Sequence, residues 1–85
     1  MLKRGSVVMS SAGKDRGTFL AVLRVEPDGI WIADGRHRPL ERPKRKNPRH
    51  LAETPFTADE ASMATNRELR RALAAAKKQA AEPEA

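Results

Sequence analysis

Three turn signals within the first 35 residues constrain this chain more than any other feature. They are Gly13-Lys14-Asp15-Arg16-Gly17, Glu26-Pro27-Asp28-Gly29 and Asp34-Gly35. Glycine accepts the positive φ that tight turns need, proline presets the first turn position, and Asp-Gly is a strong hairpin signal. The runs between the turns are short and rich in β-branched and apolar residues, which favours strands. The sequence therefore predicts an antiparallel meander.

The expected strands of this meander cover residues 5–10, 18–25, 30–33 and 36–40. The second run is too apolar for clean alternation, so it is predicted to be central and partly buried on both faces, as in a small barrel. Pro39, Pro43 and Pro48 cannot donate to a sheet ladder, so residues 36–50 are expected to form an edge strand and an extended loop.

A last strand is expected over residues 49–54, ending before Pro55. Its pairing with the first strand would close the sheet into a barrel. The sequence thus predicts a mostly β fold of four or five antiparallel strands over residues 1–56.

From Phe56 onward glycine is absent and alanine dominates. Capping-box patterns begin at Thr57 and at Thr65, and the second is preferred because an apolar stripe follows it, made of Leu69, Ala72, Leu73, Ala76 and Ala80. This spacing predicts a linker from residue 57, a helix over about residues 66–81, and a frayed tail from Glu82 to Ala85. A basic sector faces away from the stripe and is either solvated or a binding surface; it holds Arg67, Arg70, Arg71, Lys77 and Lys78.

Length and residue content exclude several classes of function. Eighty-five residues form at most one small domain, without room for a deeply buried active site. The chain has no cysteine, no signal peptide and no apolar run of roughly 20 residues, which favours a cytoplasmic location and excludes disulfides. His37 and His50 have no carboxylate at metal-ligand spacing, and no phosphate-binding glycine fingerprint occurs. We therefore expect no enzyme, no metal, no cofactor and no small-molecule substrate; an acid-base nuclease using His37, His50 and Lys44 is the disfavoured enzymatic alternative.

Positive charge is concentrated in the first part of the chain. Residues 1–50 hold 12 of the 17 Lys and Arg residues but only 5 of the 11 Asp and Glu residues, and residues 36–50 alone hold seven basic residues and one acid. Like charges in one loop repel each other, so a partner with dense negative charge is the simplest explanation, and a phosphate backbone supplies it. A solvated basic loop is the alternative.

The residues predicted to contact RNA are these cations, the two in the first turn and two on the helix: Lys14, Arg16, Arg36, Arg38, Arg42, Lys44, Arg45, Lys46, Arg49, His50, Arg70 and Arg71. Gly13 and Gly17 are assigned to backbone geometry. Reversing the charge of Lys44, Arg45 and Lys46 is expected to weaken RNA binding and leave the fold intact.

Trp31 is the only tryptophan and lies between Ile30 and Ile32. If the isoleucines point into the core, alternation places the indole on the outer face, where it could stack on a base or ribose beside Arg36 and Arg38. The preferred interpretation is that the indole covers an open end of the core. With Phe19 and Phe56 as the only other aromatic residues, a platform that stacks several bases is not expected.

Two segments resemble a known family. Gly5 to Gly17, followed by Val22 and Val25, resembles a KOW motif, the strand-loop-strand unit of several ribosomal proteins, with Gly17 as its fixed glycine. The continuations Ile32 to Gly35, Leu40 to Leu51 and Thr65 to Leu73 resemble small bacterial KOW-domain RNA-binding proteins similar to a large-subunit ribosomal protein of archaea and eukaryotes. The resemblance covers about 70 of the 85 residues. Leu20 departs from it, because many KOW sequences have a small residue or glycine there.

This resemblance implies a small SH3-like barrel that binds structured RNA, most often ribosomal, through its loops. Together with the charge pattern it predicts a non-catalytic, ribosome-associated RNA-binding protein that acts in translation and does not attach to membranes. The alternatives are a protein-interaction module that binds an acidic or proline-containing peptide, and a duplex-DNA binder. The sequence does not indicate the oligomeric state.

Overall fold

Five antiparallel strands and one helix build the chain in the computed structural model, which describes residues 1–81. The strands are β1 (Ser6–Ser10), β2 (Phe19–Glu26), β3 (Gly29–Ala33), β4 (Lys44–Lys46) and β5 (Leu51–Thr57), and the helix is α1 (Asn66–Ala81). A short 3-10 helix, η1 (Pro48–His50), joins β4 to β5. The predicted tail, Glu82 to Ala85, lies outside the described residues.

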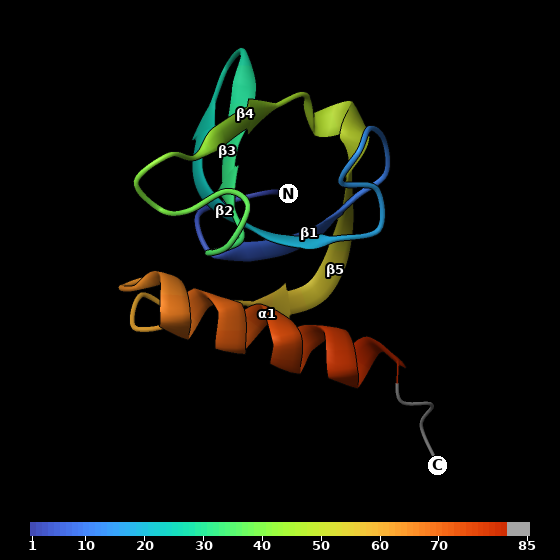
Figure 1. Cartoon of the computed structure of the whole chain (residues 1–85). Coiled ribbons are helices and arrows are strands. Elements are labelled where there is room, and N and C mark those ends of the chain that lie inside the picture. The colour runs from blue at the N-terminus through green and yellow to red at the C-terminus, as the bar shows by residue number, and fades with distance from the viewer. Residues whose placement is uncertain (82–85) are drawn as a thin grey trace.

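The strands form one sheet in the order β4-β3-β2-β1-β5. Figure 1 shows that this sheet curls strongly, with η1 connecting its two edge strands. A register shift at Leu23, between the Val22–Ile32 and Arg24–Trp31 pairs, increases the local bend. The expected pairing of the last strand with the first is confirmed. Within residues 1–81 no ladder joins β4 to β5, so the sheet is open.

Alternation along the strands creates two apolar clusters, one on each face of the sheet. Val8, Leu20, Val22, Ile30, Ile32 and Leu51 form the cluster inside the curl. Val7 and Ala21 point to the opposite face, where helix residues join them. The prediction that β2 is partly buried on both faces is therefore confirmed, since Leu20 and Ala21 are both at most 1% exposed but belong to different clusters.

Helix α1 packs against the outer face of the sheet (Figure 1). It begins where the second capping box predicts, because the Glu68 amide donates to the Thr65 hydroxyl at 3.1 Å. Leu69 and Leu73 contact the small side chains of Ala21 and Ala33 within one cluster, so the helix can lie close to the strands. The stripe ends earlier than expected: Ala76 is buried but Ala80 is exposed.

Two strand predictions are wrong. Residues 36–40 form no strand, because the Asp34-Gly35 turn closes on itself when the amides of Asp34 and Gly35 both donate to the Arg38 carbonyl. The fourth strand lies further on, at Lys44–Lys46, and is an edge strand as the prolines predicted.

The last strand continues through Pro55 to Thr57 instead of ending before it. A register shift falls between the Ser6–Thr57 and Val8–Glu53 pairs, which places Pro55 in a bulge. A residue in a bulge is not paired in the ladder, so the missing N–H of proline costs no hydrogen bond there. The Thr54 hydroxyl donates to the Val7 carbonyl at 2.6 Å there. Among residues 1–81, no helix has the length and apolar character to cross a bilayer.

Candidate nucleic-acid interface

The first turn is a structured loop between β1 and β2. Gly13 and Gly17 have φ values of 84° and 89°, as the assignment to backbone geometry predicted. The Arg16 amide donates to the Gly13 carbonyl and the Gly17 amide to the Ser10 carbonyl, which closes the loop. Lys14 and Arg16 are consequently exposed, whereas Asp15 between them is half-buried.

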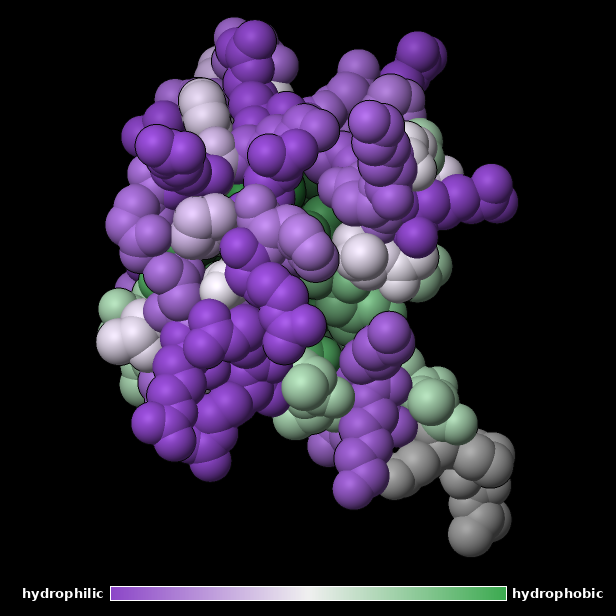
Figure 2. Space-filling model, viewed as in Figure 1, coloured by the Kyte–Doolittle hydropathy of each residue, from purple (hydrophilic) through white to green (hydrophobic). Residues whose placement is uncertain are grey.

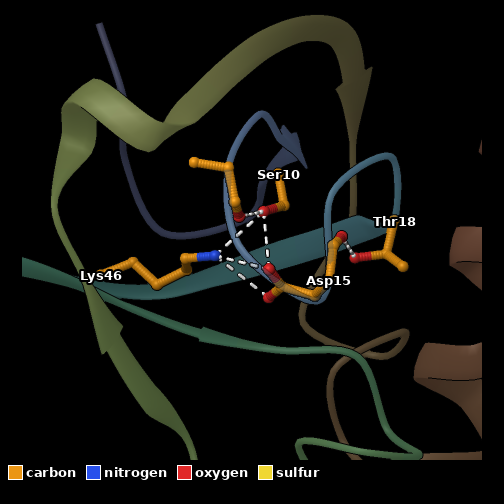
Figure 3. Close-up of polar contacts among 5 residues, drawn as sticks. Ser10, Asp15, Thr18 and Lys46 are labelled. Carbon is orange, nitrogen blue, oxygen red and sulfur yellow. Dashed lines mark hydrogen bonds and ion pairs between the residues drawn. The ribbon is translucent and has the colours of Figure 1, made fainter.

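A buried ion pair ties this loop to the edge strand β4 (Figure 3). The Lys46 ammonium donates to both carboxylate oxygens of Asp15, at 2.8 and 3.1 Å, and to the Ser10 hydroxyl at 2.9 Å. The Lys46 side chain is only 7% exposed, and that of Asp15 is 27% exposed. Burial tends to raise the pKa of Asp15, but hydrogen bonds from Lys46 and Ser10 outweigh it and hold that pKa below its usual value.

We expect acid to destabilise the protein through Asp15. Because its pKa is lower in the folded than in the unfolded chain, the ion pair contributes fully above about pH 4 and is lost as the pH falls through the folded-state pKa. Urea unfolding, followed by the fluorescence of Trp31 from about pH 6 to 2, should show this loss. In an Asp15→Asn variant the free energy of unfolding should depend less steeply on pH. A Glu60→Gln variant should keep the native dependence, since Glu60 is exposed and its ion pair with Arg4 is screened by solvent. An unchanged slope in Asp15→Asn would contradict the assignment.

The second basic loop, residues 34–41, is held by its own turn and by the helix. One carboxylate oxygen of Asp34 accepts the amides of Arg36 and Arg38, both at 2.8 Å. The Arg70 guanidinium donates to the Gly35 carbonyl at 2.7 Å. Asn66 bridges the Leu40 amide, at 2.8 Å, and the Glu41 carboxylate, at 2.7 Å. The first turns of α1 therefore position the arginines of this loop.

Three adjoining hollows connect these loops into one basic groove. The β4 hollow, of about 380 Å³, lies between the first loop and β4-η1 and is lined by Ala12, Gly13, Lys14, Asp15, Arg38, Lys44, Arg45, Lys46, Asn47 and His50. The central hollow, of about 430 Å³, is lined by Lys14, Asp15, Thr18, Leu20, Asp34, His37 and Arg38. The helix hollow, of about 260 Å³, is lined by Thr18, Phe19, Asp34, Arg36, His37, Arg70, Leu73, Ala74 and Lys77. Each hollow shares lining residues with the next, so the three lie side by side, and together they are called the basic groove. Figure 2 shows hydrophilic side chains over most of one face of the molecule, with apolar residues recessed between its upper part and the helix.

The structure brings most of the predicted contact residues to this groove. Those that line it are Lys14, Arg36, Arg38, Lys44, Arg45, Lys46, His50 and Arg70. Arg16, Arg42, Arg49 and Arg71 are exposed but do not line the three hollows. Arg45 is partly engaged already, because its guanidinium pairs with Asp28 at 2.9 Å.

Lys46 is predicted to contact RNA, but its ammonium is buried and saturated by Ser10 and Asp15, which leaves it no donor for a phosphate. Charge reversal at Lys46 would place a carboxylate against Asp15, so we now expect the triple reversal of Lys44, Arg45 and Lys46 to destabilise the fold.

Trp31 lies on the outer face of the sheet, as alternation predicted, with Ile30 and Ile32 in the cluster inside the curl. It does not cover an open end of that cluster, so the preferred interpretation is wrong. Its neighbours are Arg24, whose guanidinium lies 5.5 Å from the ring centroid, and Arg45, its partner on β4. Arg36 and Arg38 line the groove instead.

The groove also contains residues outside the predicted set. His37 and Lys77 add positive or titratable groups, and Phe19, Leu73 and Ala74 form an apolar floor in the helix hollow. The sequence predicts Phe19 and Leu73 as strand and helix core positions, and in the structure Leu73 belongs to the cluster between sheet and helix and Phe19 packs against it. Nothing in their local pattern indicates that the helix, loop 34–41 and β2 converge there.

Within residues 1–81 no group of three histidine or carboxylate side chains could hold a metal ion. No protein-family model matches the chain, and the comparison with curated proteins found no match.

Proposed function

We propose that this chain is a non-catalytic RNA-binding protein that holds structured RNA, such as ribosomal RNA, in the basic groove. One observation carries the proposal: six exposed Lys and Arg residues from four separate segments line the same three adjoining hollows and make no ion pair within residues 1–81. They are Lys14, Arg36, Arg38, Lys44, Arg70 and Lys77.

The acids in the groove do not neutralise these cations. Asp15 is paired with the buried Lys46, which leaves Asp34 as the one other carboxylate lining the three hollows, against six exposed cations. The exposed cations Lys14, Arg38 and Lys44 make no ion pair within residues 1–81. A row of unneutralised charge along a groove is the electrostatic footprint expected for a phosphate backbone.

The proposal extends to the fold and the setting. In this proposal the curled sheet, which is open between β4 and β5, is a partly open SH3-like barrel of the KOW type, with the β1-loop-β2 unit as its motif and Gly17, at φ 89°, as the glycine of that motif. Its place is the cytoplasm, on the ribosome. Sedimentation with ribosomal subunits that disappears after nuclease treatment supports this setting, whereas nuclease-resistant association favours a peptide-binding module.

A triple variant with Lys14, Arg38 and Lys44 changed to Glu tests the groove. We expect RNA affinity to fall by more than about tenfold, and the slope of log affinity against log salt to become shallower by about 2 to 3, because each phosphate contact contributes roughly 0.7 to 0.9. Fluorescence anisotropy with a labelled RNA hairpin measures both quantities.

The matched control changes Lys3, Arg67 and Lys78 to Glu. These residues are exposed and lie outside the groove, so this variant has the same net charge as the first. Equal losses in the two variants would show that only overall charge matters and would refute a groove site.

A further inference from the structure

We propose that the helix hollow receives one unpaired base of the RNA, and that Asp34 selects a base with an exocyclic amino group. This inference rests on the proposed function and names the part of the RNA that one section of the groove binds.

The helix hollow differs from the rest of the groove in its floor. Phe19, Leu73 and Ala74 provide an aromatic ring and two aliphatic groups at one end of a row of otherwise charged side chains. A phosphate gains nothing from such a floor, whereas the face of a base stacks on an aromatic ring in any sequence. Structured RNA offers unstacked bases in loops and bulges.

The rim of the hollow supplies the charges that the neighbouring phosphates need. Arg36 comes from loop 34–41, and Arg70 and Lys77 come from α1. The bond from Arg70 to the Gly35 carbonyl holds its guanidinium at the junction of loop and helix. A nucleotide bound here would therefore have its base over the floor and its phosphates at the rim.

Asp34 distinguishes a base from a phosphate. Its Oδ1 accepts the Arg36 and Arg38 amides, whereas no hydrogen bond within residues 1–81 uses Oδ2, which has the His37 Nδ1 atom 3.9 Å away. The Asp34 side chain is 16% exposed, and Oδ2 is not among the buried unpaired atoms, so it keeps some contact with solvent. A free carboxylate oxygen repels a phosphate but accepts from an amino group, as Asp and Glu do from cytosine N4.

Filling the hollow tests the base site. Ala74 lines the hollow and Ala75 does not, yet both are exposed helix positions where leucine is tolerated. We expect Ala74→Leu to weaken binding of a short single-stranded oligocytidine by about tenfold, the order of one lost stacking contact, and Ala75→Leu to leave it unchanged. Inorganic polyphosphate, which has phosphates but no bases, should bind equally to both variants.

The outcomes separate this inference from the proposed function. If Ala74→Leu has no effect on oligocytidine while the Lys14, Arg38 and Lys44 reversal weakens RNA binding, the base site is refuted and the groove stands. If Ala74→Leu weakens polyphosphate as much as oligocytidine, the hollow binds phosphate and the base site is also refuted.

Asp34→Asn tests the selectivity. Asparagine keeps an oxygen that can accept the two loop amides but places an amide donor where Oδ2 stood. The native protein should prefer oligocytidine to oligouridine, and this variant should lose or reverse that preference without losing affinity for polyphosphate. An unchanged ratio of the two affinities would overturn the role of Asp34.

Discussion

Replacing Asp15 with alanine should lower the free energy of unfolding by about 3 kcal/mol, because it leaves the buried Lys46 ammonium without a counter-charge. Lys46 is 7% exposed, and only the Ser10 hydroxyl remains as a protein acceptor for its ammonium. Urea unfolding monitored by Trp31 fluorescence measures the change. Trp31 is the only tryptophan and lies on the outer face of the sheet, so its fluorescence reports on unfolding of the sheet.

Lys46→Met should lower the free energy of unfolding by less than Asp15→Ala does. Lys46→Met removes the ammonium but leaves Asp15, which is 27% exposed and keeps its hydrogen bond with the Ser10 hydroxyl. We expect a loss of about 1 to 2 kcal/mol. The double variant Asp15→Ala, Lys46→Met should be more stable than Asp15→Ala alone, since no unpaired charge remains in the interior. Additive losses in the double variant would show that the two residues do not stabilise the fold as a pair.

The turns and the periodicity predicted most of the fold. Gly17, Asp28-Gly29 and Thr65 mark places where local chemistry alone decides the backbone, and the observed strands and helix begin or end within a few residues of them. The helix bounds agree with the prediction because the Thr65 cap and the Leu69–Leu73 spacing are both local signals. The error at residues 36–40 arises from a local turn, closed by the Asp34 carboxylate, that competes with a strand; the error at Pro55 arises from a bulge that releases proline from the ladder.

The candidate site was less predictable, because charge in a sequence does not reveal which cations face each other. Lys44, Arg45 and Lys46 are consecutive in β4, yet their side chains have three different surroundings. Lys44 is exposed in the groove, Arg45 pairs with Asp28 beside Gly29, and Lys46 turns inward to Asp15. Had the strand been placed correctly, its period of two would have separated Arg45 from its neighbours; the burial of Lys46 depends on Asp15, 31 residues earlier.

Replacing Gly35 with alanine should be as damaging as breaking the ion pair, with an expected loss of about 3 kcal/mol or more. Gly35 has a φ of 81°, which costs an alanine about 1 to 2 kcal/mol. A Cβ at this position would also lie 2.5 Å from the backbone oxygen of Asn66, in the first turn of α1. Backbone cannot rotate away as a side chain can, so the helix or the loop must move. Movement of the helix would expose Leu69, which is fully buried.

Gly17→Ala separates the cost of positive-φ strain from the cost of a Cβ clash with the helix backbone. Gly17 has a similar φ of 89°, but a Cβ there would meet no atom within 4 Å. Gly17→Ala should therefore lower the free energy of unfolding only by the backbone strain, about 1 to 2 kcal/mol. The difference between the two variants in lost free energy of unfolding measures the cost of crowding loop 34–41 against the helix. Urea unfolding gives both values, monitored by circular dichroism for α1 and by Trp31 fluorescence for the sheet. Because that approach holds Arg36 and Arg70 on the rim of one hollow, Gly35→Ala should also weaken RNA binding, whereas Gly17→Ala should weaken it less. Equal losses of stability would show that the contact between loop and helix does not position the groove.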